Sequence, residues 1–434
     1  MKRLLAATAA ALLLGVPVPA KAAPVEKLLN GSARSDLSGW SAAAQSGSLS
    51  LRRVTALTGA PAKTAVEVRS PGGSGSWAYA LSTLTAPAFE VGRTYRMTAY
   101  LRDLGGAGRT YGMLLANGSW QNRPAKVSEY VSPATAGWQR ITRTFLATAT
   151  GAADTSLYFA LPTSGPFAVQ ITNASVQPVT AYTPKRVTSA PSRTLTFAGA
   201  EGAAPDPRIW TAQTGAGGWG NGERQTYTSS TANAQLDGSG KLKITALRTG
   251  GGGYTSARLT TQDKVTINPG SYVEASITAP TGAAVWPAFW LLGANMPTVG
   301  WPACGELDVF EGTGSEPTLA KSAVHMAITR NAKIDRQYGW NEGTTDLGTP
   351  LDTGSHRFGV YFDAQTVRFY VDRKPTMVLW ASDARASDRT WPFAKPMFML
   401  LNVAIAGDVD PSATSFPRTM TVGPISVWPG GVPA

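Results

Sequence analysis

The chain has 434 residues, of which 43% are hydrophobic and 15% charged, and it carries a formal net charge of +12. This length accommodates two domains with cores of their own. The many Gly (46) and Pro (30) residues, with 13 each of Trp, Tyr and Phe, favour β-sandwiches over helical bundles. The Lys and Arg residues are scattered without a basic run or a nucleic-acid-binding motif. The charge therefore indicates at most non-specific attraction to anionic polymers and excludes a nucleic-acid partner.

Residues 1–22 have the organisation of a secretory signal. Lys2 and Arg3 precede an apolar run that continues to Val16, and the residues at 20–22 form a small-x-small cleavage site. No later apolar stretch is long enough to span a bilayer. The sequence therefore predicts a secreted, extracellular chain without a membrane partner.

Residues 23–179 read as a β-sandwich, because short strand-like runs are broken by Gly, Ser and Pro without a helical period. Acidic residues are few and unclustered here, so we identify no catalytic set. Several runs resemble jelly-roll carbohydrate-binding modules, namely 28–30, 37–40, 92–95 and 138–145. Three aromatic residues near loop-like stretches could each stack on a pyranose ring or belong to the core: Trp77, Tyr111 and Trp120.

Residues 180–193 have the Pro-, Ser- and Thr-rich composition of an exposed linker, and a second domain follows at 194–434. Its strand candidates are 241–247, 271–277, 323–328, 358–362, 367–371 and 397–403. The run 286–292 differs from them because it is apolar on both sides. Alternation places Trp286 and Trp290 on one face of that strand and Phe289 on the other.

The stretch 301–311 sets three carboxylates into an otherwise apolar run. Side chains of a strand alternate between faces, so Glu306 and Asp308 share one side. Glu311 lies at an odd offset from Glu306, which a regular strand would send to the opposite face. A β-bulge inserts one extra residue and would return Glu311 to the acidic face. The sequence therefore predicts a bulged strand with three acids in a row.

Such a row suits chemistry that needs carboxyl groups with different protonation states. Like charges a few ångströms apart raise one another's pKa, and splitting the pKa values of two carboxyls keeps one ionised and the other protonated. Glycoside hydrolysis uses such a pair. A solvated strand face and an oxygen-rich calcium site remain alternatives for three acids considered alone.

Cys304 is the one cysteine of the chain, which excludes disulfides within it. A nucleophilic thiol would need an activating neighbour, and the chain has only His325 and His356. We expect Cys304 to be a small buried residue.

The acid row and its surroundings resemble the signature of glycoside hydrolase family 16, in the bulged form typical of bacterial endo-β-1,3-glucanases (laminarinases). The stretches that carry the resemblance are 219–225, 254–258, 286–290, 301–302, 306–311, 324–325, 367–372 and 400–402. The resemblance covers nearly all of the second domain. It implies a concanavalin-like β-jelly roll of two curved antiparallel sheets, with the glycan across the concave one.

By this resemblance Glu306 is the nucleophile, Glu311 the general acid/base, and Asp308 the carboxylate between them. Retaining hydrolysis places the two reacting carboxyl groups about 5–5.5 Å apart. The resemblance assigns Trp286 and Trp290 to stacking under sugar rings. It assigns the placing of sugar hydroxyls to Asn221, Arg258, Trp301, His325 and Asn402.

These assignments have structural alternatives. Arg258 could be a counter-ion of Glu306, His325 an ordinary strand histidine, and the two tryptophans core residues. The sequence also departs from the family at 422–424, where an Asp near a structural calcium is replaced by Gly-Pro, and at 406–407 and in the loop 329–350. No cofactor is required by the resemblance, and a structural calcium is in doubt.

The sequence thus predicts a monomeric, secreted, two-domain endo-β-1,3-glucanase whose partner is its polysaccharide substrate. The same machinery acting on mixed-linkage β-glucan or a galactan is one alternative. A non-catalytic β-glucan-binding protein on the same scaffold is another.

Overall fold

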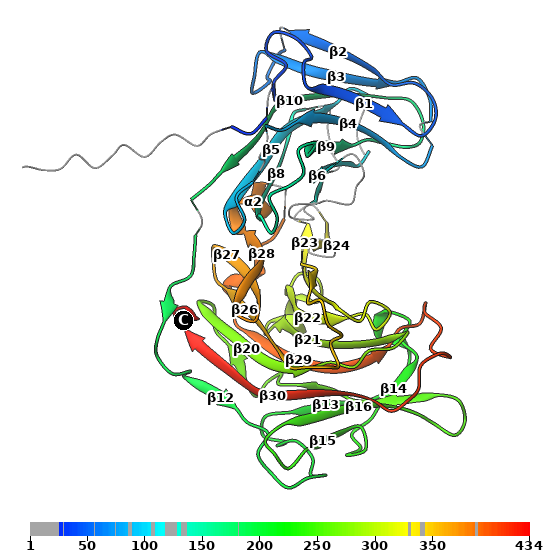
Figure 1. Cartoon of the computed structure of the whole chain (residues 1–434), viewed down its shortest axis with the longest axis vertical. Helices are drawn as coiled ribbons and strands as arrows, with labels where there is room; N and C mark the ends of the chain where they lie inside the picture. The colour runs from blue at the N-terminus through cyan, green and yellow to red at the C-terminus, as the bar shows by residue number, and fades with distance from the viewer. Residues whose placement is uncertain are drawn as a thin grey trace, which may run out of the picture.

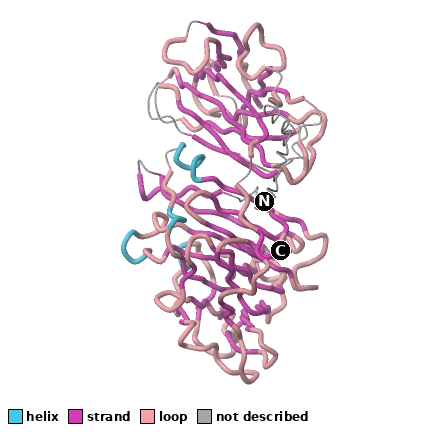
Figure 2. The backbone as a smooth tube through the Cα atoms, turned by 90° about the vertical axis from the view of Figure 1, so that its left-hand side faces the viewer, coloured by secondary structure: helices cyan, strands magenta, loops and turns pink. Residues whose placement is uncertain are grey.

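The computed structural model describes residues 26–434 except 29, 56, 74, 86–88, 106–108, 118–127, 132–136, 181, 329–330, 339–342 and 387–388. The predicted signal at 1–22 and Trp120 lie outside the described residues. Strands dominate the described chain (Figure 2), and its α-helices are short: α1 (Met296–Val299) and α2 (Ala381–Ala386). No helix in the described part is long or apolar enough to cross a bilayer. The all-β prediction is confirmed.

The first sandwich, drawn uppermost in Figure 1, packs two antiparallel sheets on each other. One sheet has the order β1 (Trp40–Ala44), β4 (Ala78–Thr83), β9 (Ser156–Ala160), β6 (Tyr111–Ala116) and β7 (Ser128–Val131). The other has the order β2 (Ser50–Thr55), β3 (Thr64–Ser70), β10 (Phe167–Pro178), β5 (Thr94–Asp103) and β8 (Gln139–Leu146).

Strand β6 is buried along its whole length, and its alternate residues belong to two different apolar clusters. In β6, Tyr111, Met113 and Leu115 are fully buried in the core between the sheets. Tyr111 is therefore a core aromatic, and its alternative as a sugar-stacking residue is wrong. Trp77 is 45% exposed and stacks on Tyr79, with ring centroids 5.6 Å apart.

The segment after the first sandwich makes ordered contacts with the C-terminus. Strand β11 (Arg186–Val187), within the predicted linker, pairs in parallel with β31 (Val432–Pro433). Val187 packs against an aromatic cluster of the second sandwich that includes Tyr272 and Trp428. Backbone pairing thus holds part of the Pro- and Ser-rich segment that composition alone marks as exposed.

The second sandwich also packs one sheet on another (Figure 1). The first sheet runs β14 (Gln225–Tyr227), β17 (Tyr254–Ser256), β16 (Leu242–Arg248), β30 (Arg418–Pro429), β20 (Ser271–Thr278), β26 (His356–Phe362), β27 (Thr366–Val371) and β28 (Lys374–Trp380), with β12 (Arg193–Leu195) on β30 and β15 (Ala234–Leu236) on β16. The second runs β13 (Thr211–Gln213), β18 (Arg258–Thr260), β29 (Met397–Ile405), β21 (Val285–Gly293), β22 (Glu306–Gly312), β23 (Leu319–Ile328) and β24 (Asn331–Tyr338), with β19 (Thr266–Ile267) on β29 and β25 (Thr345–Asp346) on β23.

The predicted bulge lies in β22. In the pairing with β21, Phe289 is opposite Phe310 and Trp290 is opposite Asp308, so Val309 is the extra residue. Val309 and Phe310 both enter the core, and Phe310 stacks on Phe358 of the opposite sheet with ring centroids 4.2 Å apart. Two consecutive core residues therefore anchor the irregularity. The next residue, Glu311, emerges on the face that carries Glu306 and Asp308.

Candidate active site

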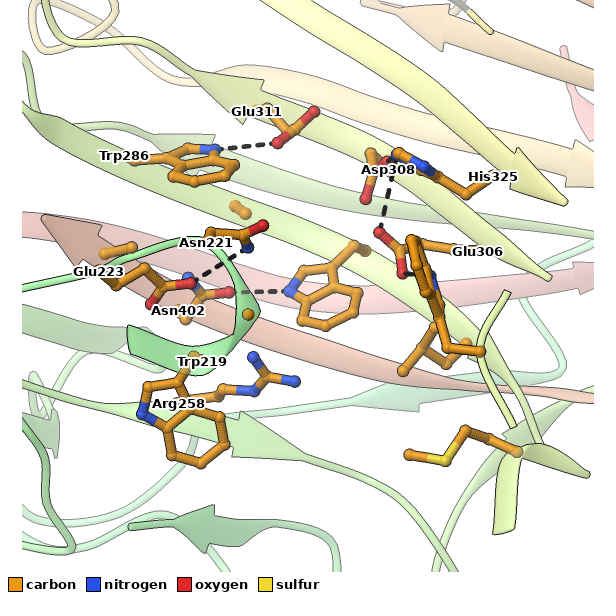
Figure 3. Close-up of a pocket in the computed structure, with 17 residues that line it drawn as sticks. Trp219, Asn221, Glu223, Arg258, Trp286, Glu306, Asp308, Glu311, His325 and Asn402 are labelled. Atoms are coloured by element: carbon orange, nitrogen blue, oxygen red, sulfur yellow. Dashed lines mark hydrogen bonds and ion pairs between the residues drawn. The ribbon is translucent and has the colours of Figure 1, made fainter. Parts of the chain in front are cut away.

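The residues singled out by the sequence line one cavity of about 510 Å³ (Figure 3). They are Asn221, Arg258, Trp286, Trp290, Trp301, Glu306, Asp308, Glu311, His325 and Asn402. The adjacent strands β29, β21, β22 and β23 supply most of them. The alternating-face argument for β21 is confirmed, because Trp286 and Trp290 face the cavity while Phe289 is buried in the core.

Glu306 lies between an indole and an imidazole. Its Oε2 accepts a hydrogen bond from Trp301 Nε1 at 2.9 Å. His325, opposite Glu306 in the β22–β23 pairing, places its Nε2 3.9 Å from Glu306 Oε1 and 3.3 Å from Asp308 Oδ2. His325 therefore contacts two of the three acids and is not a histidine of a plain strand surface.

Glu311 is hydrogen-bonded to a different tryptophan of the cavity. Its Oε1 accepts a hydrogen bond from Trp286 Nε1 at 2.9 Å, and the residue is 9% exposed. Each of the two glutamates thus accepts one indole N–H inside the cavity (Figure 3). These bonds restrict where the carboxyl groups can point.

Glu306 and Glu311 hold protons more tightly than isolated carboxyls. Burial, and next the charge of Asp308, raises the pKa of Glu306 well above its ordinary value, while His325 and the Trp301 N–H act in the opposite direction. Burial and Asp308 raise the pKa of Glu311 to about 8. Because the carboxylate form is penalised by burial and by a neighbouring negative charge, the cluster keeps a proton at neutral pH. The charge of His325 lowers the pKa of both glutamates, and its Nε2 lies 3.9 Å from Glu306 Oε1.

Arg258 lies between two rings of the cavity wall. Its guanidinium carbon is 4.8 Å from the ring centroid of Trp219 and 4.7 Å from that of Trp290. Its Nε donates to Gln213 Oε1 at 2.7 Å. This arrangement is a cation–π sandwich, and Arg258 also interacts electrostatically with Glu306, although no direct ion pair joins them among the described residues.

Comparison with known proteins agrees with this geometry. The profile of glycosyl hydrolases family 16 matches residues 221–423. The β-glucanase of Rhodothermus marinus is 32% identical over 240 residues, which are 52% of this chain and 80% of that protein. The chain belongs to glycosyl hydrolase family 16.

Other similar proteins differ in length and in activity. Glucan endo-1,3-beta-glucosidase A1 of Niallia circulans is 31% identical over 242 residues, which are 51% of this chain but only 33% of that protein. The laminarinase catalytic domain of Thermotoga maritima MSB8 shares 32% identity, with 56% of this chain and 99% of that chain covered and a TM-score of 0.47. A beta-1,3-glucan-binding protein of Penaeus monodon is 28% identical over 173 residues, which are 35% of this chain and 47% of that protein.

Sequence reasoning assigned no role to Trp219, Glu223 or Tyr227 of this family 16 domain. Trp219 and Glu223 line the cavity, and fully buried Tyr227 lies behind it. Trp290 Nε1 donates to Asn402 Oδ1 at 2.8 Å, Asn402 Nδ2 to the Tyr227 hydroxyl at 3.1 Å, and that hydroxyl to Glu223 Oε2 at 3.0 Å. Asn402 therefore holds the Trp290 indole in place. The stretch 219–225 already carried the family resemblance, which was the available signal.

One set of cavity residues has the composition of a cation site. Glu306, Asp308 and His325 each offer one ligand atom, and these atoms lie within 4.8 Å of one another. These are the same carboxyl oxygens that the resemblance assigns to catalysis. The Gly423–Pro424 departure coincides with an irregularity in the β20–β30 pairing, where a proline without an N–H is tolerated.

Cys304 is buried near this site, as expected. Burial, and next the charge of Glu306, raises the pKa of its thiol to about 11. A thiol that stays protonated at neutral pH is a poor nucleophile. Cys304 is therefore not a candidate nucleophile of this cavity.

Proposed function

We propose that this protein is a secreted, monomeric endo-β-1,3-glucanase that hydrolyses laminarin-like β-glucan with retention of anomeric configuration. One observation carries the proposal: the bulge at Val309 brings Glu311 to the cavity face that holds Glu306. The β-glucanase names of similar proteins support the substrate class.

In the proposed first step, the Glu306 carboxylate attacks the anomeric carbon while Glu311 gives its proton to the glycosidic oxygen. An ester bond to Glu306 forms as the glycosidic bond breaks, and the sugar chain on the leaving side departs as an alcohol. In the second step Glu311, now ionised, takes a proton from water. The resulting hydroxyl adds to the anomeric carbon and releases Glu306.

The neighbouring residues have supporting roles in this proposal. His325 stabilises the negative charge on Asp308 and Glu306, which keeps Glu306 able to attack. The indoles of Trp286 and Trp290 present aromatic surface to the C–H faces of sugar rings. Asn221, Arg258 and Trp301 line the same cavity and would place sugar hydroxyls.

A non-catalytic glucan-binding role is the second candidate, favoured by the similarity to the Penaeus monodon protein. A binder does not need three carboxyl groups in one cavity, which argues for hydrolysis. Incubation with laminarin separates the two: new reducing ends are expected from an enzyme, and co-sedimentation without new ends from a binder. A panel of β-1,3-glucan, mixed-linkage β-glucan and galactan reports the preferred linkage. NMR of the first-formed anomer tests retention.

For the first sandwich we propose carbohydrate binding through Trp77, which is exposed and backed by Tyr79. Replacing Trp77 by Ala should weaken co-sedimentation with insoluble β-1,3-glucan by roughly fivefold to tenfold, since an aromatic–sugar contact is lost. Val91→Ala, at a position 62% exposed in the same sandwich, is the matched control. Equal binding by both variants would remove Trp77 from the proposed surface.

A further inference from the structure

The two sandwiches contact each other through β8 of the first and β28 with α2 of the second (Figure 1). Asp383 of α2 accepts the backbone N–H of Thr144 at 2.5 Å and pairs with Arg96 at 3.3 Å. The Arg96 guanidinium also lies over the Trp380 ring, 5.0 Å from its centroid. Asp383 of the second sandwich thus binds a backbone N–H and a guanidinium of the first sandwich. The ring of Trp380 contacts the same guanidinium.

A buried ion pair forms the second contact between the sandwiches. Arg389 Nη2 lies 2.5 Å from Glu129 Oε1, and the two side chains are 3% and 2% exposed. Removing one member of such a pair takes a buried opposite charge away from the other, which is strongly destabilising. The pair therefore requires both sandwiches to stay in this arrangement, unlike a surface ion pair that solvent can replace.

The segment that carries Arg389 is bonded to β23, the strand that presents His325 to the cavity. The backbone N–H of Arg389 donates to Ala384 of α2 at 2.9 Å. Thr390 donates from its N–H and its hydroxyl to the carbonyl of Ala327, at 3.0 and 3.1 Å. Ala327 lies in β23 two residues beyond His325, which contacts Asp308. A short series of bonds therefore joins Glu129 of the first sandwich to the strand that presents His325.

We infer that the first sandwich is a fixed partner of the second rather than a tethered one, and that Arg389 is a positioning residue whose pairing with Glu129 holds the end of β23 and thereby His325. The inference that the two sandwiches are docked rests only on the contacts between them. The effect on turnover rests on the proposed hydrolase function.

The test compares full-length Arg389→Met and Glu129→Gln with the parent chain. Each single variant should unfold in two calorimetric transitions where the parent unfolds in one, and should expose the segment 180–193 to added protease. The double variant should recover much of the single transition, because the two opposite buried charges are then removed together. Arg52→Met is the matched control, since the Arg52–Glu67 pair lies in β2 and β3 at the far end of the first sandwich (Figure 1).

The positioning role of Arg389 can be measured separately from its effect on stability. The ¹H–¹⁵N resonances of the His325 ring, resolved from the single other histidine, should shift in Arg389→Met but not in Arg52→Met. On laminarin, kcat should fall roughly threefold to thirtyfold with KM little changed. Should Arg389→Met fail to fold, Asp383→Asn tests the same interface at its other contact.

Several outcomes separate the inferences. A single transition together with unshifted His325 resonances in Arg389→Met and in Asp383→Asn would overturn docking and positioning together. Two transitions with unshifted resonances would overturn the positioning role alone. A parent chain that releases no reducing ends from laminarin would overturn the proposed function, while calorimetry and NMR would still decide the docking.

Discussion

Replacing Glu306 by Gln should abolish hydrolysis of laminarin while leaving laminarin binding intact. The amide has nearly the shape of the carboxyl group but cannot attack the anomeric carbon, so turnover should fall on the order of 10⁴-fold or more. Trp301 donates its N–H to Oε2 of Glu306, and the amide oxygen can accept the same bond. Reducing-end release and calorimetric titration with laminarin measure the two quantities separately.

The matched control for this change is Glu201→Gln, which removes a carboxylate from the same sandwich at a side chain that is 74% exposed. It should leave turnover unchanged. In Glu306→Ala, whose shortened side chain leaves room at the anomeric carbon, added azide should restore part of the cleavage and give a glycosyl azide of inverted configuration, while the chain on the leaving side departs as an alcohol. Normal turnover by Glu306→Gln would reject the nucleophile assignment.

The second large effect concerns Glu311, whose pKa is raised to about 8, first by burial and next by Asp308. An acid must be protonated to act, so kcat should fall as pH rises through about 8. In Glu311→Gln this alkaline limb should disappear, and turnover of laminarin should drop by about 10²- to 10⁴-fold. An aryl β-glucoside oligomer with a good leaving group should be affected less, because its departure needs no proton.

Stability gives an independent check on the same group. A carboxyl whose folded pKa is raised keeps its proton in the folded state, so folding is penalised increasingly as pH rises from about 4.5 towards 8. Glu311→Gln removes this penalty. The variant should therefore unfold at a higher temperature than the parent at pH 8 and at a similar temperature at pH 4. A variant that is less stable at pH 8 would contradict burial as the cause of the raised pKa.

The acid row could be predicted from the sequence because its signal is local. Alternation fixes the faces of Glu306 and Asp308, and the odd offset of Glu311 requires one extra residue, which the structure identifies as Val309. The same rule does not decide Tyr111, because the residues on both faces of β6 are apolar and buried. Local patterns of this kind survive folding since each strand must bury one of its faces.

Contacts between distant parts of the chain could not be predicted from the sequence. Asn402 meets Tyr227 across 175 positions, and Asp383 meets Thr144 across 239. Neither pair has a spacing rule, because the approach of two strands is decided by how whole sheets pack. Composition also marked 180–193 as an exposed linker, although Arg186 and Val187 pair with the C-terminal strand. Backbone hydrogen bonding there does not depend on side-chain type.

In the proposed hydrolase, the two indole N–H groups that bond Glu306 and Glu311 would link ligand affinity to reactivity. Trp301 and Trp286 cannot be removed as inert aromatic surface, because each loss also frees a carboxyl group to rotate and alters how readily it ionises. Substituting either tryptophan would then lower ligand affinity and turnover together. Conversely, the fluorescence of these rings should follow the protonation of the acids beside them, giving the cavity an optical reporter of its own charge state.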